Sequence, residues 1–321
     1  MKLYTQVPLQ DQNPKISYHD NMVLLGSCFV ENIAEKLSYF KFRHILNPFG
    51  ILFHPKAIET LLWMAVNKER YTKEDLFQYN NLWHSFDAHS SLSHAEDYKV
   101  LSNLNTGASN LFSALQNANY IFITLGTAWV YQLKSIDLIV ANCHKIPASE
   151  FEKKLLSVND LVSSLYNSIE LIRQANPTCN IIFTVSPVRH VKDGVIENSR
   201  SKSHLVTAVH TVLEEDKNIN YFPSYEILMD ELRDYRFYKQ DLLHPNETAI
   251  QIIWERLVAT WFSKEVQHEI KEVDSIQKGL LHRPFHEESE QHQKFKTDLQ
   301  NKIASIQQKF PFMKFENEID N

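Results

Sequence analysis

The sequence predicts a three-layer α/β/α fold, in which a parallel β-sheet lies between two layers of helices. Three apolar runs of four to six residues each end at a small residue, as buried parallel strands do. Segments with helical periodicity separate these runs. Strands that alternate with helices favour a parallel sheet covered on both faces. The 321 residues, 43% of them hydrophobic, are enough for one large core.

The first strand is predicted at residues 22–25, an apolar run that stops at Gly26. Directly after it, four apolar residues recur at the spacing of one helix face: Val30, Ile33, Ala34 and Leu37. Gly26-Ser27-Cys28 is therefore expected to form the turn from this strand into a helix.

Two further strands are predicted at residues 120–125 and 181–185, which stop at Gly126 and Ser186. Helices are expected over three segments: 56–67, about 157–175 and roughly 201–215. A last helix follows Asn246, which fits an N-cap, and has one apolar face as far as residue 261.

Ligands of such sheets bind at the carboxyl ends of the strands. The polar loops 87–110 and 188–200 are therefore expected to line the site. Beyond about residue 265 the chain is highly charged and its apolar residues are sparse.

A helical stripe nevertheless continues in this last part of the chain, at Phe295, Leu299, Ile303 and Ile306. The expected organisation is a domain over residues 1–265 followed by a helical extension over 266–321. The stripe is expected to pack within the protein, and formation of a homodimer through it is the second interpretation.

The charge balance offers no basic surface for nucleic acid or anionic membrane, because 33 Lys and Arg face 39 Asp and Glu, a net charge of −6. Three widely spaced cysteines, Cys28, Cys143 and Cys179, form neither a disulfide framework nor a C-x-x-C pair. The first residues lack the apolar core of a signal peptide, and no run approaches the ~18 apolar residues of a membrane span. A cytoplasmic protein with free thiols is expected.

Two segments carry residues suited to catalysis, Gly26-Ser27-Cys28 and Asp241-x-x-His244. Free N–H groups in the first turn of a helix stabilise an oxyanion or a thiolate. A histidine can accept the proton of a nucleophile, and an aspartate one turn before it can fix the imidazole tautomer. Backbone N–H groups of glycine loops, such as those at Gly50 and Gly126, can face the developing oxyanion.

Residues 24–30, Leu-Leu-Gly-Ser-Cys-Phe-Val, closely resemble the signature of the GSCFA-domain family, bacterial proteins related to the SGNH/GDSL hydrolases. Further segments support the resemblance in their order: 47–50, 124–127, 142–145, 185–187, 201–203, 221–226 and 241–244. The resemblance covers roughly residues 20–260 and implies a flavodoxin-like parallel sheet within the three-layer sandwich.

The resemblance also implies catalytic roles. The superfamily's Gly-Asp-Ser block aligns with Gly26, Ser27 and Cys28. The nucleophile is therefore Cys28 if its position in the block decides, or Ser27 if the residue type decides. Cys28 is favoured, because a thiol that is paired with a histidine at a helix N-terminus can be largely thiolate at neutral pH. Asp241 and His244 match the final Asp-x-x-His block.

The oxyanion-binding positions match the superfamily less well. The second block's glycine would be Gly50. The third block, Gly-x-Asn-Asp, becomes Gly-Thr-Ala-Trp at residues 126–129, so its asparagine is missing. Asn142, Asn47 or the Thr127 hydroxyl could replace it. Gly50 and Gly126 could equally serve only as tight turns.

Other polar residues are expected to be structural. Residues 84–89, His-Ser-Phe-Asp-Ala-His, would divide their histidines and aspartate between the two faces of an extended segment, which argues against a metal site. Lys202 is expected to be solvated at the start of its helix. Cys143 and His144 alternate faces and would not act as a pair.

The predicted function is that of a hydrolase or acyltransferase acting on an ester, thioester or related acyl group of a small-molecule or saccharide-linked substrate. This chemistry requires no cofactor or metal. The alternative is a binding protein on a degenerate hydrolase fold, and a scaffold assembled through the C-terminal helix is the third hypothesis. The motifs G-x-G-x-x-G, G-x-x-x-x-G-K-[ST] and G-x-S-x-G are absent from the sequence.

Overall fold

A computed structural model describes residues 5–283, 285–286 and 289–315. The described chain divides into two compact units. The first holds residues 5–8, 21–34 and 44–253, and the second holds 9–20, 35–43 and those from 254 onward. Besides the residues from 254 onward, the second unit takes in two segments from the N-terminal part of the chain.

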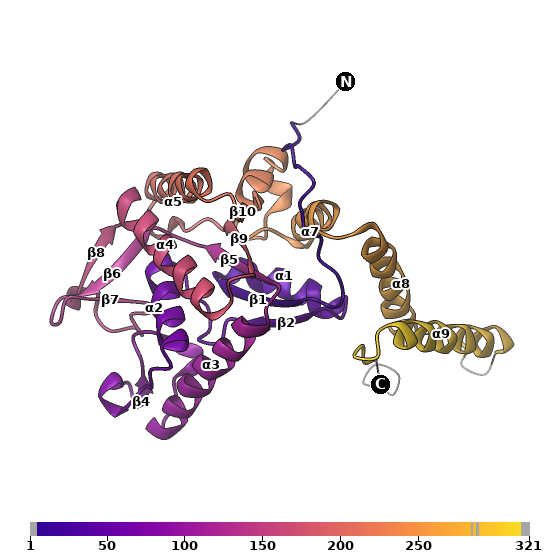
Figure 1. Cartoon of the computed structure of the whole chain (residues 1–321), viewed down its shortest axis with the longest axis horizontal. Coiled ribbons are helices and arrows are strands. Elements are labelled where there is room, and N and C mark those ends of the chain that lie inside the picture. The colour runs from indigo at the N-terminus through magenta and orange to yellow at the C-terminus, as the bar shows by residue number, and fades with distance from the viewer. Residues whose placement is uncertain (1–4, 284, 287–288, 316–321) are drawn as a thin grey trace. The chain divides into compact units, whose positions relative to one another are not determined.

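The first unit is built on a five-stranded sheet (Figure 1). Its strands, in spatial order, are β10 (Ile219–Tyr221), β9 (Asn180–Val185), β5 (Tyr120–Leu125), β1 (Asn21–Gly26) and β2 (Arg43–Leu46). The pairs β1–β5, β5–β9 and β9–β10 are parallel. The predicted three-layer α/β architecture and the three predicted strands are confirmed.

Helices separate these strands along the chain, as predicted. The long ones are α1 (Cys28–Tyr39), α2 (Pro55–Val66), α3 (Asp97–Asn117), α4 (Val158–Ala175), α5 (Val195–Glu215) and α7 (Glu247–Trp261). Shorter turns of helix lie at Lys73–Asp75, Ser90–Leu92, Ala148–Glu150, Val191–Asp193, Ser224–Glu226, Ile227–Glu231 and Tyr235–Phe237. Asn246 accepts a hydrogen bond from the Ala249 N–H at 3.1 Å, which confirms the predicted cap of α7.

The two predicted loops are shorter than expected. Residues 97–110 belong to α3, and residues 195–200 belong to the first turns of α5. Val195 and Ile196 in the first turn of α5 are exposed. This turn does not extend the apolar stripe of the helix, so the sequence prediction placed the start of α5 too late. In α3 the small residue Gly107 lies on the buried face and packs closely on the Pro48 carbonyl and the Phe49 ring.

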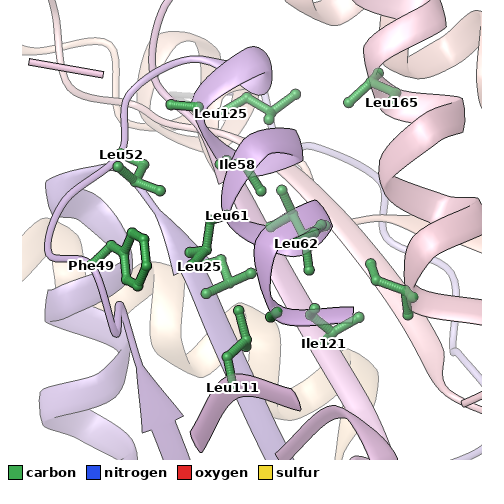
Figure 2. Close-up of a cluster of buried hydrophobic side chains, with 14 of the residues drawn as sticks. Leu25, Phe49, Leu52, Ile58, Leu61, Leu62, Leu111, Ile121, Leu125 and Leu165 are labelled. Atoms are coloured by element: carbon green, nitrogen blue, oxygen red, sulfur yellow. The ribbon is translucent and has the colours of Figure 1, made fainter. Parts of the chain in front are cut away.

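One face of the sheet forms the main hydrophobic core with α2, α3, α4 and α5. Alternate residues of each strand point to this face, as the two-residue period of a strand requires. Figure 2 shows Leu25, Ile121 and Leu125 of the sheet beside Leu61 and Leu62 of α2, Leu111 of α3 and Leu165 of α4. Each fully buried leucine of this kind contributes roughly 1.5–3 kcal/mol.

Successive strands are added to the sheet first on one side of β1 and then on the other side. The chain passes from β1 to β2 on one side, and then crosses back to β5 on the other side. Since such crossovers are right-handed, α1 belongs on the sheet face opposite α2–α5. At a reversal of this kind the carboxyl ends of the two flanking strands form a crevice, which here lies between the ends of β1 and β5.

Two small antiparallel sheets are added to this framework. One is the hairpin of β3 (Phe77–Tyr79) and β4 (Leu82–His84). The other consists of β6 (Trp129–Leu133) between β7 (Leu138–Val140) and β8 (Phe151–Leu155). This second sheet follows β5 directly, so it begins at the crevice.

The second unit contains α8 (Lys264–Leu280) and α9 (Glu290–Lys309), which pack against each other. Ile303 and Ile306 of the predicted stripe are buried, and they lie on α9 as expected. Within the described residues no helix is both long enough and apolar enough to span a membrane.

Candidate active site

The turn after β1 is held firmly against β5. Gly26 has a φ of +128°, and a Cβ at this position would lie 2.1 Å from the Thr124 carbonyl oxygen, so only glycine fits. The Ser27 N–H donates to the same oxygen at 3.0 Å, and the Gly26 N–H donates to Asn47 Oδ1 at 2.8 Å. The residues that follow Gly26 are therefore fixed at the crevice.

The two candidate nucleophiles have different surroundings. Ser27 is completely buried, and its Oγ has no hydrogen-bond partner among the described residues. Cys28 is the first residue of α1 and is partly exposed. Its Sγ lies 3.9 Å from His244 Nε2. The geometry thus pairs the histidine with Cys28 and not with Ser27.

His244 is oriented by Asp241. The imidazole Nδ1 lies 2.6 Å from Asp241 Oδ2, while Oδ1 accepts the N–H groups of Leu243 at 2.8 Å and His244 at 3.0 Å. These backbone bonds, followed by the bond to the imidazole, lower the pKa of Asp241 to about 2. An ionised carboxylate can only accept, so in the neutral imidazole Nδ1 holds the hydrogen and Nε2 presents its lone pair to the thiol.

The electrostatic surroundings of the thiol differ from the expectation that Cys28 is largely thiolate at neutral pH. Burial raises the pKa of Cys28, and the Glu31 carboxylate raises it further. The charge of Lys202 and the N–H groups of Cys28 and Phe29 act in the opposite direction but do not outweigh burial. Cys28 therefore rests as a thiol, and an attack by its sulfur would require a base to remove the proton.

The backbone donors expected from the glycine loops are already engaged. The Gly50 N–H donates to the Asn47 carbonyl at 2.8 Å. The N–H groups of Gly126 and Thr127 both donate to the Phe53 carbonyl, at 2.8 and 2.9 Å. In this arrangement the three N–H groups hold loops together and are not directed at a reacting carbonyl.

The side chains considered as substitutes for the missing asparagine also differ in availability. The Thr127 hydroxyl accepts from the Trp129 N–H and lies 3.0 Å from Ser201 Oγ. Asn142 Oδ1 accepts from the His144 N–H at 2.8 Å. Asn47 Nδ2 is buried and has no partner within the described chain. Asn47 therefore has an uncommitted donor next to the turn that it fixes through Gly26.

Lys202 is an unexpected member of the site. Contrary to the expectation of a solvated side chain, it is fully buried, and Nζ donates to the carbonyls of Gly126 and Ser186 at 2.7 Å each. These are the first residues after β5 and β9. Burial lowers its pKa to about 7. The sequence contains a signal for this burial, because Lys202 continues the stripe of Leu205, Val209 and Val212 on α5.

His190 is a second residue that sequence analysis missed. Its Nε2 is buried without a partner among the described residues, and it would lie 3.4 Å from a Cβ added at Gly126. Burial, with smaller effects from Lys202 and His244, lowers the pKa of His190 to about 3, so the imidazole is neutral at neutral pH. No sequence motif marked this residue.

The histidines of residues 84–89 have structural partners. His84 contacts Ser93 Oγ and the Tyr79 carbonyl, and His89 accepts from the Ser91 N–H in a short helical turn. Cys143 lies beside His144, whose Nε2 bonds the Ser85 carbonyl at 2.7 Å. Among the described residues, no three His, Cys, Asp or Glu side chains are grouped so that they could hold a metal ion.

A cavity of about 470 Å³ opens beside the crevice. Residues from three segments line it, namely Phe53 and His54, a set between Thr127 and Phe151, and His190 and Lys192. The set in the middle contains Trp129, Tyr131, Val140, Ala141, Asn142, Cys143, His144, Lys145, Ile146 and Ala148. Asn142 and Thr127 thus lie on the cavity wall.

Comparison with known proteins gives two matches to family models. The model described as GSCFA family matches residues 21–257, and the model described as GSCFA domain protein, C-terminal domain, matches residues 273–321. No curated protein matches the chain.

Among solved structures, the chain is distantly similar to a carbohydrate esterase family 3 from Talaromyces cellulolyticus, at 10% identity and a TM-score of 0.35, covering 79% of this chain and 99% of that one. It is also similar to an acetyl xylan esterase from Butyrivibrio proteoclasticus, at 11% identity and a TM-score of 0.39, covering 77% and 64%.

Proposed function

The chain belongs to the GSCFA family, and we propose that it is an acyl hydrolase or acyltransferase acting through Cys28, His244 and Asp241. The imidazole of His244 contacts the thiol of Cys28 through one ring nitrogen and the carboxylate of Asp241 through the other. The observation that carries this proposal is the pair of contacts from His244, 3.9 Å to Cys28 Sγ and 2.6 Å to Asp241 Oδ2. These contacts join two segments that are far apart in the sequence, and they link nucleophile, base and carboxylate in the sequence that a catalytic triad requires.

In the proposed reaction, His244 Nε2 removes the proton of Cys28 as Sγ attacks the carbonyl carbon of the substrate. The imidazolium formed is stabilised by Asp241, whose low pKa keeps it ionised. The carbonyl oxygen becomes an oxyanion, for which the N–H groups of Cys28 and Phe29 at the start of α1, together with Asn47 Nδ2, are the donors.

The intermediate then collapses to a thioester of Cys28, and His244 gives its proton to the leaving alcohol or thiol. Water, or an acceptor hydroxyl, next attacks the thioester while His244 takes its proton. The C–S bond then breaks, the acid or the new ester leaves, and His244 returns the proton to Cys28 Sγ. Hydrolysis and transfer share this acyl-enzyme and differ only in the acceptor.

A binding protein on the same fold is the second candidate, and one observation favours it. The N–H groups of Gly50, Gly126 and Thr127 are all bonded to backbone carbonyls, which leaves fewer oxyanion donors than the superfamily pattern implies. Loss of one such donor costs on the order of 10²–10³ in rate.

Intact-mass spectrometry after incubation with p-nitrophenyl acetate separates the two candidates. An acetyl adduct is expected on the native chain and on Ser27→Ala, and is expected to be absent from Cys28→Ala and His244→Ala. Cys143 and Cys179 provide an internal control, because burial raises the pKa of these thiols to about 11 and about 12. If the native chain gains no adduct, or if the adduct persists in Cys28→Ala, the proposed mechanism is wrong.

A further inference from the structure

Arg189, in the loop after β9, is bonded directly to the segment that carries His244. Its N–H donates to the Leu243 carbonyl at 3.2 Å. Its guanidinium Nη1 lies 3.4 Å from the Leu242 carbonyl oxygen. Both contacts are made within two residues of the imidazole that touches Cys28 Sγ, so Arg189 is a close neighbour of the triad.

Three tyrosines accompany this guanidinium. Arg189 Cζ lies over the Tyr238 ring, 6.0 Å from its centroid, and the Tyr235 ring is 5.8 Å from that of Tyr238. Burial raises the pKa of Tyr225 and of Tyr238, and the positive charge of Arg189 acts against burial at both phenols. Tyr225 is therefore also close to the guanidinium. We call these four residues, Arg189, Tyr225, Tyr235 and Tyr238, the Arg189 cluster.

Backbone pairing holds Tyr238 beside the segment of His244. Tyr238 forms an antiparallel bridge with Pro245, and the Lys239 N–H donates to the His244 carbonyl at 2.8 Å. The side chain of His244 is 42% exposed, and Tyr235 is 62% exposed. The Arg189 cluster thus has an accessible aromatic face along the loop that presents the imidazole.

The guanidinium of Arg189 has unused hydrogen-bonding capacity. It carries five N–H donors, of which one makes the bond to a carbonyl described above. Among the described side chains, no carboxylate lies within ion-pair distance of it. Asp241 bonds the His244 imidazole, Glu226 accepts from a tyrosine hydroxyl, and Asp230 is exposed. A partly buried arginine without an ion pair, next to a candidate catalytic base, is suited to an anionic group of the substrate.

We infer that the Arg189 cluster binds the leaving part of the substrate, and that this part is an alcohol or phenol bearing a carboxylate. The inference rests on the proposed function and names its substrate class. In the proposed reaction Cys28 Sγ bonds to the acyl carbon, and the ester C–O bond breaks with its electron pair on oxygen. That oxygen then takes the proton of His244. The leaving part must therefore lie beside His244, where the cluster is.

The composition of the cluster favours a carboxylate on a flat or apolar frame. The guanidinium presents parallel N–H donors that match the two oxygens of a carboxylate, and its single charge balances one negative charge. The tyrosine rings offer apolar faces on which the rest of the leaving part can pack.

The first test compares 3- and 4-acetoxybenzoate with the corresponding acetoxybenzamides. All four esters leave the same acetyl group on Cys28 and differ in the charge of the phenol released. The rate of acetylation is measured by intact mass and divided by the rate of each ester with free cysteine. For the native chain we expect the better benzoate to exceed its amide by about 10- to 100-fold per unit of substrate, as for a hydrogen bond to a charged group.

Arg189→Gln removes the charge, and Arg70→Gln, at an exposed arginine beyond the end of α2, is the matched control. The preference for the benzoate is expected to fall to within about threefold of the ratio seen with free cysteine in Arg189→Gln, and to remain at the native value in Arg70→Gln. The ratio is used because any general effect of the substitution on acylation cancels between the two esters.

A second assay requires no catalysis. Alkylation of Cys28 by iodoacetamide is followed by mass in the presence of 3- or 4-hydroxybenzoate, or of the matching hydroxybenzamide. The hydroxybenzoate is expected to slow alkylation of the native chain at concentrations at which the amide does not, and to protect Arg189→Gln less. Because the native chain alone gives the comparison of acid with amide, this assay decides the matter even if Arg189→Gln does not fold.

The outcomes separate the two proposals. Acylation without preference for the anionic esters, or a preference that Arg189→Gln retains, overturns the carboxylate site while the proposed function stands. Equal protection by acid and amide also contradicts the site. Absence of acylation by every ester, in a native chain of confirmed fold, overturns the proposed function and with it the assignment of a leaving group. Protection by hydroxybenzoate would then show only that Arg189 binds a carboxylate beside Cys28.

Discussion

Replacing Lys202 with methionine should change how the stability of the first unit depends on pH. Burial holds the pKa of Lys202 at about 7, against an ordinary value of 10.5. Between these two values the unfolded chain keeps the proton that the folded chain has released. The free energy of unfolding of the native protein therefore rises through this window by about 1.4 kcal/mol per pH unit, or about 5 kcal/mol in all.

Methionine fills nearly the same space but does not titrate. It leaves the Gly126 and Ser186 carbonyls without their donor, at about 1–3 kcal/mol each. Below pH 7 this loss is offset by removal of the buried ammonium, so the two proteins should be nearly equal in stability. Towards pH 9 the offset disappears, and the variant should fall behind the native protein by about 2 kcal/mol relative to pH 7.

Urea unfolding followed by circular dichroism at pH 6, 7, 8 and 9 measures this difference. Both proteins should carry Cys28→Ala, because ionisation of this thiol at the upper end of the pH range would raise the pKa of Lys202 and distort the comparison. A difference in unfolding free energy that stays constant within about 1 kcal/mol from pH 6 to pH 9 would refute the assignment of Lys202 as a buried lysine that releases its proton near neutrality.

Three further changes test the turn, the triad and a helix cap. Gly26→Ala should lower the unfolding free energy by on the order of 3 kcal/mol or more, because its Cβ would lie 2.1 Å from the Thr124 oxygen at a φ of +128°; an unchanged thermal midpoint would contradict this. Asp241→Asn should slow acylation of Cys28 by p-nitrophenyl acetate about 10³–10⁴-fold, since the amide favours the wrong imidazole tautomer, and a burst of native size would show that Asp241 is dispensable. The pKa of Asp241 is about 2, so protonation of this carboxyl should not lower the acylation rate of the native protein between pH 4 and pH 7. Any decrease of the acylation rate in that pH range should therefore also be seen in Asp241→Asn. Asn246→Ala should cost about 2 kcal/mol in urea unfolding, because it loses the cap and the bond from Nδ2 to the Arg236 carbonyl, and Asn246→Ser, which keeps the cap, should cost about 1 kcal/mol less; equal effects of the two would exclude a capping role.

The elements that the sequence predicted well are those whose signal is local. The strands β1, β5 and β9 are short apolar runs, and a buried strand of this kind can be predicted from the residues of the run alone. Residues 97–110 were predicted as part of a polar loop, although the buried residues of α3 recur at helical spacing, at Val100, Leu104, Ala108, Leu111 and Leu115. The local signal was therefore present and was obscured by the polar residues between these positions. Gly107 lies on the same buried face, where a Cβ would be 3.0 Å from the Pro48 carbonyl oxygen.

The sequence predicted the triad of the candidate site, but not its neighbours Lys202 and His190 and not the protonation state of its groups. The order of Cys28, Asp241 and His244 along the chain matches a family pattern, and the structure brings them together. The pKa of Cys28 and the burial of Lys202 depend on what the folded chain packs around them. The same holds for the N–H groups of Gly50 and Gly126, whose partners are set by loops far away in sequence.

Which of Ser27 and Cys28 faces His244 depends on where the strand β1 ends and the helix α1 begins. The Ser27 N–H donates to the Thr124 carbonyl of β5, so Ser27, one residue after the end of β1, is still bonded to the sheet. Its own carbonyl accepts the Val30 N–H at 2.9 Å, which starts the helix. Cys28 is consequently the first helical residue, with its side chain at the crevice and in reach of His244. A shift of one residue would bury the thiol and expose the hydroxyl, so the backbone register alone determines that the thiol, and not the hydroxyl, faces His244.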